Sequence, residues 1–285
     1  MDGLTLVQDG RRLACKHGHS FDIARQGYVN LLGASDKRSQ DPGDSKDMIN
    51  ARREFLDAGH YLPVATRLVE LLKQEIDSSS LVVDAGCGEG YYLQQLQAQL
   101  ESTRHSAPLI IGFDISKWAV QAASRRLSAT WLVASNRNIP VAANSADYVL
   151  SLFGFPVFES FQKVLKEGGS LVCVNAGPRH LIELREIIYP EVKHSESTVI
   201  QQALAAGFTA GETSTLEFKT EALNREEIKL LLTMTPHLFR ASHEGKQRAA
   251  QLDQLAVTVD VVFQFLHNGL PARPHQAPCT DPGNA

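Results

Sequence analysis

Short apolar runs alternate with amphipathic segments through the middle of the chain. Runs with the length and composition of buried strands occupy residues 81–85, 109–115, 131–134, 148–152 and 170–175. Helical spacing of apolar residues occupies 91–99, 117–127, 159–165 and 179–188. Near-continuous apolar strands separated by helices indicate a parallel sheet with helices on both faces. The pattern therefore predicts an α/β chain with a Rossmann-like doubly wound sheet, whose ligands bind at the carboxyl ends of the strands.

The same patterning extends this fold on both sides. Ser45 can cap a helix over the residues that follow it, and a second helix is predicted over residues 61–74. Further on, residues 213–234 predict a strand and then a helix that begins near Asn224. Residues 257–266 alternate enough to predict the last strand of the sheet.

Two stretches without apolar patterning divide the chain. Residues 36–45 combine acids, bases, proline and glycine without an apolar side chain, which is typical of a polar connector. The last residues contain four prolines and have little to bury, so we expect a disordered tail. We therefore predict a small N-terminal module, a large domain and a tail, at residues 1–34, 35–268 and 269–285.

Composition and charge narrow the classes of partner. The chain has 285 residues, of which 43% are hydrophobic, so it can bury a full core. Its net charge of -4 argues against a general polyanion binder, so any nucleic-acid contact must be a local patch. No apolar run approaches the roughly 20 residues that span a bilayer, and no secretory signal is recognisable. Four dispersed cysteines favour a reducing compartment, so we expect a cytoplasmic protein without membrane contact.

A glycine-rich turn follows the first strand of the alternation. The stretch VDAGCGEGYY places Gly86, Gly88 and Gly90 at every second position. Glycine tolerates positive φ and has no Cβ, so a ligand can lie against the turn and the N-terminus of the next helix. The stretch is neither a G-x-G-x-x-G dinucleotide fingerprint nor a phosphate loop, which needs a Lys-Ser/Thr pair. A tight strand-to-helix turn without a ligand is the alternative.

A carboxylate ends the next strand, in the run LIIGFDIS. Asp114 is expected beside the glycine turn, where it can accept two ribose hydroxyl groups; capping of the following helix is the alternative. Together, the patterns D-x-G-x-G-x-G and G-x-D-x-S resemble the cofactor motifs of class I S-adenosylmethionine-dependent methyltransferases. The resemblance implies that Asp84 binds the methionine amino group, and that Ser135 lies in a loop beside the adenine. An ordinary polar loop is the alternative for Ser135.

Longer blocks of sequence resemble one family within this class. The segments FDIARQGYVNLL, KRSQDPGDSKDMINARREFLDAGHY, CGEGYY and AGPRHLIEL are similar to the RlmA family of 23S rRNA guanine-N1 methyltransferases. The resemblance implies an enzyme that transfers methyl from S-adenosylmethionine to N1 of one guanine in a hairpin loop of 23S rRNA. It also implies a homodimer. Position by position, it implies further cofactor contacts at Tyr61, Glu89, Tyr92, Leu93 and His180.

Two of these cofactor assignments, and the function itself, have alternatives. Tyr61 can simply close a helix end as a partly buried aromatic residue, and His180 can be a surface residue or a helix cap. Cofactor motifs do not identify the acceptor, so a methyltransferase that acts on a small molecule or a protein is an alternative function. A noncatalytic protein that binds RNA or S-adenosylmethionine is another.

The N-terminal module departs from the family pattern. The family carries a four-ligand zinc site, made of an early C-x-x-C pair with a later cysteine and histidine. Cys15 and His19 match the later pair, His17 is a further imidazole, and no cysteine precedes Cys15. Two or three local ligands bind zinc weakly, so we expect an incomplete site in a chain that begins inside the finger. The alternative is a small hydrophobic module in which Cys15 is a free thiol.

Two further sets of residues are candidates for the chemistry on guanine. N1 of neutral guanine carries a proton that a base must remove, and Asp41 and Asp44 are the candidates. Turn and cap formation around Pro42 is the alternative for both acids. After the fourth strand, SLFGFP replaces the Asn-Pro-Pro-Tyr-like motif of many amino-methylating relatives, which disfavours exocyclic adenine chemistry. Phe153 or Phe155 could stack on a flipped base, but core packing is the role expected for either.

Basic side chains near the connector predict a local contact with RNA phosphates. The residues concerned are Arg25, Lys37, Arg38, Arg52 and Arg53, with Tyr28 nearby as a stacking platform. A solvated, charged helix face is the alternative for Arg52 and Arg53.

Overall fold

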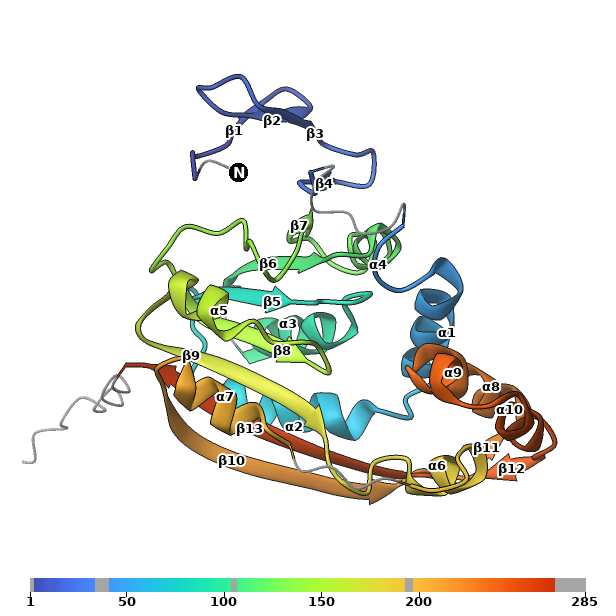
Figure 1. The fold of residues 1–285 in the computed structure, drawn as a ribbon. Coiled ribbons are helices and arrows are strands. Elements are labelled where there is room, and N and C mark those ends of the chain that lie inside the picture. The colour runs from blue at the N-terminus through green and yellow to red at the C-terminus, as the bar shows by residue number, and fades with distance from the viewer. Residues whose placement is uncertain (1–2, 34–40, 104–106, 193–196, 270–285) are drawn as a thin grey trace, which may run out of the picture.

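The computed structural model of the chain describes residues 3–33, 41–103, 107–192 and 197–269. Within these residues a central eight-stranded sheet has the order β10-β13-β9-β8-β5-β6-β7-β4 (Figure 1). Its strands are β4 (Tyr28–Asn30), β5 (Leu81–Ala85), β6 (Leu109–Asp114), β7 (Thr130–Val133), β8 (Ala146–Leu152), β9 (Leu165–Ala176), β10 (Phe208–Lys219) and β13 (Thr258–Asn268). The strands from β9 to β4 are parallel, and β13 and β10 add an antiparallel pair at the far edge. The predicted Rossmann-like α/β fold is confirmed.

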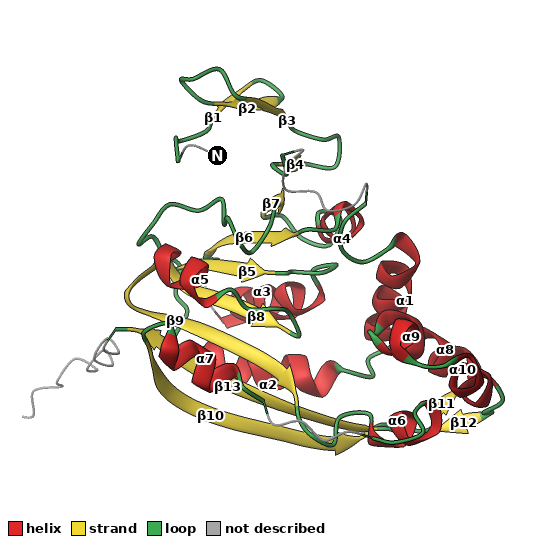
Figure 2. Cartoon of the chain, viewed as in Figure 1, coloured by secondary structure: helices red, strands yellow, loops and turns green. Residues whose placement is uncertain are grey.

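Helices cover this sheet and continue beyond one end of it (Figure 2). They are α1 (Lys46–Asp57), α2 (Leu62–Leu72), α3 (Tyr91–Thr103), α4 (Lys117–Ala123), α5 (Phe158–Val164), α6 (Ile182–Ile188), α7 (Val199–Ala205), α8 (Arg225–Met234), α9 (His237–Arg240) and α10 (His243–Ala250). Each strand predicted between residues 81 and 175 is present, and β5 has the predicted bounds. No helix in the described part of the chain is long and apolar enough to cross a membrane.

Two of the helices predicted between residues 91 and 188 are shorter than expected. The helix predicted over 117–127 ends at Ala123, because the next residues form tight turns such as the bond from Arg126 N–H to Ala123 O (2.9 Å). The helix predicted over 179–188 begins only at Ile182. Leu181 has a φ of 54° and donates its N–H to Thr258 O (2.7 Å), so only its carbonyl, which accepts the N–H of Arg185 (2.9 Å), joins the helical hydrogen bonds.

Buried apolar side chains form two clusters, which pack on opposite faces of the sheet. On β8, Val149 belongs to one cluster and the next residue, Leu150, to the other, as the alternation of side chains along a strand requires. Leu68 of α2 and Leu96 of α3 pack with Leu150, whereas Phe161 of α5 packs on the opposite face. The parallel strands are therefore covered on both faces, as their apolar sequences predict.

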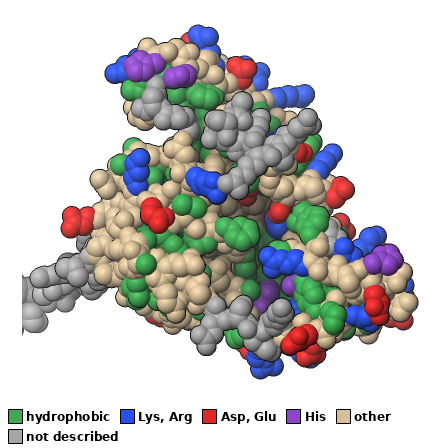
Figure 3. Space-filling model, viewed as in Figure 1, with side chains coloured by type: hydrophobic (Ala, Val, Ile, Leu, Met, Phe, Trp, Pro, Cys, Tyr) green, Lys and Arg blue, Asp and Glu red, His purple; other side chains and the backbone are tan. Residues whose placement is uncertain are grey.

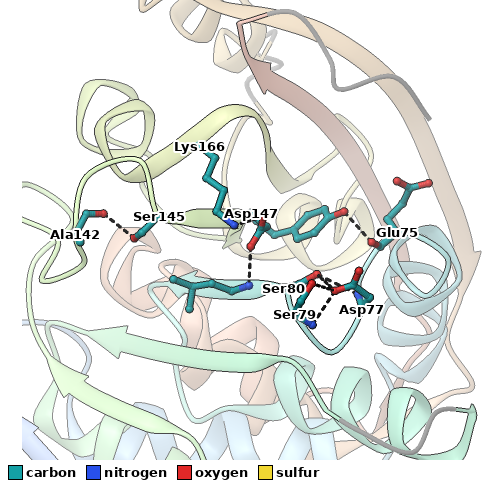
Figure 4. A network of polar contacts seen from close by, with 10 residues as sticks. Glu75, Asp77, Ser79, Ser80, Ala142, Ser145, Asp147 and Lys166 are labelled. Atoms are coloured by element: carbon teal, nitrogen blue, oxygen red, sulfur yellow. Dashed lines mark hydrogen bonds and ion pairs between the residues drawn. The ribbon is translucent and has the colours of Figure 1, made fainter. Parts of the chain in front are cut away.

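A polar network fixes the start of β5 against the start of β8 (Figure 4). Leu81 N–H donates to Asp147 Oδ2 (2.8 Å), and Lys166 Nζ lies 2.6 Å from Asp147 Oδ1. Tyr148 Oη donates to the carbonyl of Glu75 (3.0 Å). These contacts secure the amino ends of the strands, and the candidate site lies at the opposite, carboxyl ends.

The N-terminal residues form a small antiparallel sheet of β1 (Val7–Asp9), β2 (Arg12–Ala14) and β3 (Ser20–Asp22) (Figure 1). The chain then enters the large sheet, because β4 pairs in parallel with β7 and Leu31 N–H donates to Val133 O (2.9 Å). Val29 and Leu31 are buried there. The chain thus joins the large sheet before the predicted boundary at residue 34, and the division into domains remains a prediction.

Residues 223–255, between β10 and β13, form a helical lobe of α8, α9 and α10 with the short pair β11 (Leu223–Asn224) and β12 (Gln254–Leu255). The lobe packs on the rest of the molecule through α8, which contacts α1, and through α10, which contacts α6. The predicted cap at Ser45 is confirmed, and α8 begins next to Asn224 as predicted. Ser45 Oγ accepts the N–H of Met48 (3.3 Å), and Asn224 Oδ1 accepts the N–H of Glu227 (3.1 Å).

Candidate functional site

The glycine turn, residues 86–90, connects β5 to α3 at the carboxyl end of the parallel strands. Gly86, Gly88 and Gly90 have φ angles of 89°, 55° and 84°, which L side chains rarely adopt. A Cβ on Gly90 would lie 3.1 Å from Ala123 Cβ, so this glycine allows close packing on α4. A Cβ on Gly86 would meet no atom within 4 Å. Gly86 therefore borders open space in which a ligand can lie.

Asp84, near the end of β5, is a buried acid without a full set of partners. Its side chain is 1% exposed, and its Oδ1 has no hydrogen-bond partner among the described residues. Burial, and then the charge of Asp114, raise the pKa of Asp84 to about 8. A buried carboxylate oxygen without a partner is unfavourable. A cationic donor such as an amino group would satisfy this oxygen and favour its ionised form.

Asp114 ends β6 and holds the other side of the glycine turn. Its Oδ2 accepts the N–H of Gly88 (3.1 Å), and its Oδ1 accepts the N–H of Ser116 (2.8 Å). Burial raises the pKa of Asp114, and the two backbone hydrogen bonds oppose that rise. Ser116, not Asp114, caps α4. Each carboxylate oxygen keeps a free lone pair, so Asp114 can accept hydroxyl groups while it holds the turn. The two acids and the open glycine turn fit S-adenosylmethionine.

Four rings meet beside the glycine turn, and we call Tyr61, Tyr92, Phe153 and His180 the ring cluster. The centroid of the Phe153 ring lies 6.4 Å from that of Tyr61, and 6.1 Å from those of Tyr92 and His180. The four residues come from the start of α2, the start of α3, the end of β8 and the turn before α6. The fold thus brings together the three predicted cofactor residues of this set and adds Phe153.

His180 is hydrogen-bonded through both ring nitrogens. Nδ1 lies 2.9 Å from the carbonyl oxygen of Asp260, and Nε2 lies 3.1 Å from Tyr61 Oη. The N–H of Asp260 also approaches Nδ1, at the longer distance of 3.3 Å. We assign the proton to Nδ1, because the shorter contact is to a carbonyl, which only accepts; Tyr61 then donates to Nε2. Burial lowers the pKa of His180 to about 4 and raises the pKa of Tyr61, so both rings are uncharged at pH 7.

Phe153 and Phe155 are both exposed, so the core packing expected for them is wrong. Phe153 is 38% exposed and Phe155 is 82% exposed. β8 ends at Leu152, and beyond a strand end the alternation that buries side chains against a sheet face no longer applies. The sequence carries no other signal that would have distinguished these two residues from core residues.

Arg52 points toward the glycine turn, although it was predicted to bind RNA. Its Nη2 lies 2.7 Å from Asp44 Oδ2 and donates to the carbonyl of Met234 (2.9 Å). A Cβ on Gly88 would lie 3.9 Å from Arg52 Nη1. Arg52 thus ties the connector and the helical lobe together beside the turn, whereas the neighbouring Arg53 is exposed.

A helical reading of the sequence contains a signal for this difference. Arg52 is three residues after Ile49 and four before Leu56, and both of these apolar residues are buried. Residues at these spacings share a helix face, so Arg52 lies at the edge of the buried face of α1. The sequence analysis treated Arg52 and Arg53 as a pair and did not use this spacing.

The side chains of three predicted cofactor residues are buried or already bonded within the protein. Glu89 is 2% exposed and its Oε2 lies 2.5 Å from Arg126 Nε. Leu93 is buried in the apolar core. Ser135 Oγ accepts the N–H of Arg137 (3.3 Å) within its own loop. A cofactor contact by Glu89 or Leu93 would therefore have to come from the backbone, and all three roles remain predictions.

The two candidate bases in the connector are both paired. Asp41 Oδ2 accepts the indole N–H of Trp118 (2.7 Å), and Asp41 Oδ1 lies 3.1 Å from Lys117 Nζ. The Trp118 and Lys117 contacts lower the pKa of Asp41, which makes it a weak base. Asp44 is paired with Arg52, on the side of the connector that faces the glycine turn.

The residues proposed for zinc do not make a complete site. Cys15 Sγ lies 3.4 Å from His19 Nδ1. Residues 3–33 and the rest of the described chain contain no group of three His, Cys, Asp or Glu side chains that could hold a metal ion. A closed structural zinc site has four ligands, so the residues present do not fit one.

The remaining predicted RNA contacts differ in how far the structure describes them. Arg25 is exposed, and Tyr28 is half-buried in β4; Lys37 and Arg38 lie outside the described residues. Figure 3 shows basic side chains on the N-terminal sheet and on the helical lobe, with a hollow between the lobe and the body of the molecule. The RNA-binding roles remain predictions.

Comparisons with known proteins identify the family of the chain. Residues 1–40 match the profile described as "RlmA, N-terminal", and residues 82–171 match "Methyltransferase domain". A 23S rRNA (guanine(748)-N(1))-methyltransferase of Streptomyces fradiae is 31% identical, over 90% of this chain and 91% of that protein. A provisionally named 23S rRNA (guanine-N(1)-)-methyltransferase of Micromonospora griseorubida is 32% identical, over 79% of each chain. A Bacillus subtilis protein with a similar provisional name is 28% identical, over 88% of this chain. The resemblance read from the sequence is confirmed, and the chain belongs to the RlmA family of 23S rRNA (guanine-N1)-methyltransferases.

Proposed function

We propose that this protein transfers the methyl group of S-adenosylmethionine to N1 of a guanine in 23S rRNA. The observation that carries the proposal is Asp84 Oδ1, which has no hydrogen-bond partner among the described residues and lies beside the open glycine turn. It supports a site for a cationic ligand in a chain whose relatives are named for this reaction. The relatives' names favour this acceptor over a small molecule or a protein.

The proposed cofactor site uses residues from the ends of β5 and β6 and from the ring cluster. Asp84 accepts the methionine amino group, Asp114 accepts the ribose hydroxyls, and Gly86 leaves space for the ligand. Tyr61, Tyr92 and His180 form an uncharged wall beside it. When bound, S-adenosylmethionine supplies an electrophilic methyl group on a sulfonium. The protein's contribution is to hold the reacting groups in line and to exclude water from them.

The reaction also needs a base, because the proton on guanine N1 must leave as the N–CH₃ bond forms. Of the two candidates, we favour Asp44. The low pKa of Asp41 makes it a poor proton acceptor, and Asp41 is already bonded to Trp118. Asp44 lies beside Arg52, which approaches the glycine turn. A proton taken by Asp44 passes to solvent, since its side chain is 35% exposed.

The finer parts of the proposal concern the RNA and the assembly. We propose that the substrate guanine lies in a hairpin loop and that two copies of the chain act together. In this proposal residues 1–34 form an RNA-recognition module, and Arg25, Tyr28 and Arg53 contact the RNA with Lys37 and Arg38. Ribosomal RNA as the substrate places the enzyme in the cytoplasm.

Transfer of labelled methyl to unmodified 23S rRNA tests the function. The RNA is digested after reaction, the labelled fragment is mapped, and the modified base is identified by mass spectrometry. We expect one equivalent of N1-methylguanine at a single position with the wild-type chain, and a rate roughly 10- to 100-fold lower with Asp84→Asn at limiting S-adenosylmethionine. Bound S-adenosylmethionine without transfer to the RNA would contradict the proposed function.

A further inference from the structure

The aromatic loop, residues 153–156 after β8, presents two rings that the proposed function has not yet used. Phe155 is 82% exposed and Phe153 is 38% exposed, although burial of a phenylalanine is favourable. Phe153 also has a φ of 53°, which is an outlier for a bulky residue. Strain of this kind persists only where the surrounding structure fixes it, and it clusters at functional sites.

Contacts on both sides hold the aromatic loop beside the cofactor site. The N–H of Phe153 donates to a carbonyl of β9 (2.7 Å), and Asn136 Nδ2 donates to the carbonyl of Phe155 (2.9 Å). A Cβ on Gly154 would lie 3.6 Å from the carbonyl oxygen of Ala85, the residue directly before the glycine turn. The loop is therefore preorganised at the edge of the turn, where an acceptor must come to meet the methyl group.

The ring of Phe153 has a protein side and an open side. Tyr61, Tyr92 and His180 lie against it, at centroid distances of 6.1–6.4 Å. Tyr61 and His180 are hydrogen-bonded to each other and are uncharged at pH 7. Figure 3 shows hydrophobic side chains along the hollow between the body and the helical lobe. A flat, uncharged ring that is open on one side suits a nucleobase better than a charged or aliphatic group.

We infer that the target guanine stacks on the open side of Phe153, and that Phe155 contacts the adjacent nucleotide. The inference rests on the proposed function and assigns the place of the acceptor base. Enzymes that modify a base must take it out of the RNA stack, and stacking on aromatic rings holds the released base. Stacking accepts every base, so Phe153 positions the guanine, and its choice over other bases depends on other groups.

Three single variants test the role of Phe153. Phe153→Leu keeps an apolar side chain at the same positive φ but removes the aromatic face, whereas Phe153→Tyr keeps that face. Phe239→Leu is the matched control, because Phe239 is 71% exposed on α9 and has no assigned role. We expect Phe153→Leu to lower kcat/KM for RNA by roughly 10- to 100-fold, the effect of losing a base–aromatic stack. Phe153→Tyr and Phe239→Leu should stay within about threefold of wild type.

Binding of S-adenosylmethionine separates this role from a cofactor contact. Calorimetry should give the same cofactor affinity for wild type and Phe153→Leu, and thermal unfolding should give similar midpoints. Equal kcat/KM for the wild type and Phe153→Leu would overturn the inference. So would a loss of cofactor affinity as large as the loss of activity. If the wild type itself does not methylate 23S rRNA, the proposed function fails instead.

Fluorescence gives a readout that does not depend on methyl transfer. An RNA fragment carries 2-aminopurine in place of the mapped guanine, and the emission of this base falls when it stacks on a ring. At saturating protein, we expect the 2-aminopurine emission to be lower in the complex with the wild type than in the complex with Phe153→Leu. Phe155→Leu should weaken RNA binding by roughly 5- to 50-fold and leave this quenching in place. Equal emission with wild type and Phe153→Leu would overturn the stacking geometry, and binding of a protein instead of RNA at this loop would overturn the ligand class.

Discussion

Asp84 is buried, and one of its carboxylate oxygens has no partner among the described residues, so its environment disfavours the charged form. The folded protein consequently holds a proton that the unfolded chain releases at neutral pH. This state is unfavourable without a ligand, and a cationic ligand relieves it. The residue thus couples folding, proton binding and cofactor binding.

Asp84→Asn should stabilise the protein when S-adenosylmethionine is absent. The pKa of Asp84 is about 8 in the folded protein, against an ordinary value of 3.8. The stability contributed by the protonated carboxyl is complete below about pH 4 and is lost as the pH rises toward 8. The variant has no such loss, so its advantage in free energy of unfolding should grow over this range, by at most about 1.4 kcal/mol for each pKa unit. Urea unfolding of both proteins at several pH values measures this difference in free energy of unfolding. A difference that does not change with pH would contradict the raised pKa.

The same variant should bind S-adenosylmethionine roughly 10- to 100-fold more weakly, because a hydrogen bond between opposite charges is lost. Calorimetry measures this affinity. In the wild type, cofactor binding below pH 8 should release a proton from Asp84. Titrations in buffers with different ionisation enthalpies detect that release. Unchanged cofactor affinity in Asp84→Asn would exclude the proposed role of this carboxylate.

Arg52→Ala and Arg53→Ala should have different effects, although the two arginines are adjacent. Arg52→Ala leaves Asp44 and the carbonyl of Met234 without their partner, so we expect a loss of about 1–3 kcal/mol in the free energy of unfolding. Arg53 is exposed, so Arg53→Ala should keep the wild-type stability. It should instead weaken RNA binding and reduce the salt slope by about one phosphate contact. Thermal unfolding and RNA titrations at several salt concentrations compare them, and equal stability of the two variants would contradict the contacts of Arg52.

At the scale of elements, residues 41–45, the described part of the connector before α1, are docked on the end of β6. Ser116 Oγ donates to the carbonyl of Asp44 (2.7 Å), and Asp41 bonds the indole of Trp118. A Cβ on Gly43 would lie 2.8 Å from Ile115 Cγ2 and 2.9 Å from the backbone N of Ser116. The connector therefore lies directly against the segment that carries Asp114.

Gly43→Ala should displace the connector, and Gly59→Ala provides a control. Gly43 has a φ of 84° and Gly59 a φ of 89°, so alanine is strained at both positions, by about 1–2 kcal/mol. Only at Gly43 would the new Cβ also collide with neighbouring atoms. We expect Gly43→Ala to be more destabilising than Gly59→Ala in chemical unfolding, and to weaken cofactor binding through the displaced segment. Equal losses for both variants would show that the connector moves without cost.

The elements also show which local signals suffice to predict a boundary. The bounds of β5 and the caps at Ser45 and Asn224 follow from apolar runs and capping residues, which act over a few residues. The start of α6 depends on the hydrogen bond from Leu181 to Thr258, which lies far away in the sequence. A contact between such distant residues leaves no local sequence pattern, so the helix was predicted to begin too early.

At the scale of the whole molecule, the N-terminal sheet is linked to the large one through β4. Val29 and Leu31 are buried against the sheet that carries the glycine turn. Apolar packing and hydrogen bonds therefore attach the proposed RNA-recognition module to the edge of the sheet that carries the glycine turn. This attachment does not involve Cys15 and His19, which lie in the turn between β2 and β3.

Zinc removal should leave the methyltransferase site unchanged. Cys15 and His19 supply two ligands, and two ligands leave half of a tetrahedral zinc shell to water. We expect substoichiometric zinc after dialysis against a chelator, by elemental analysis, and the same S-adenosylmethionine affinity before and after. Cys15→Ser should leave the main unfolding transition unchanged. One tightly held zinc per chain would contradict the incomplete site.

The sequence by itself determined the sheet, its parallel core and the two acids beside the glycine turn. These features depend on periodicity and short spacings, which neighbouring residues specify directly. Only the tertiary structure decided that Tyr61 and His180 meet at Phe153, and that Arg52 bonds the carbonyl of Met234. Such contacts join segments that lie far apart in the chain. They depend on how helices and loops pack on the sheet, and no repeating pattern of apolar and polar residues specifies that packing.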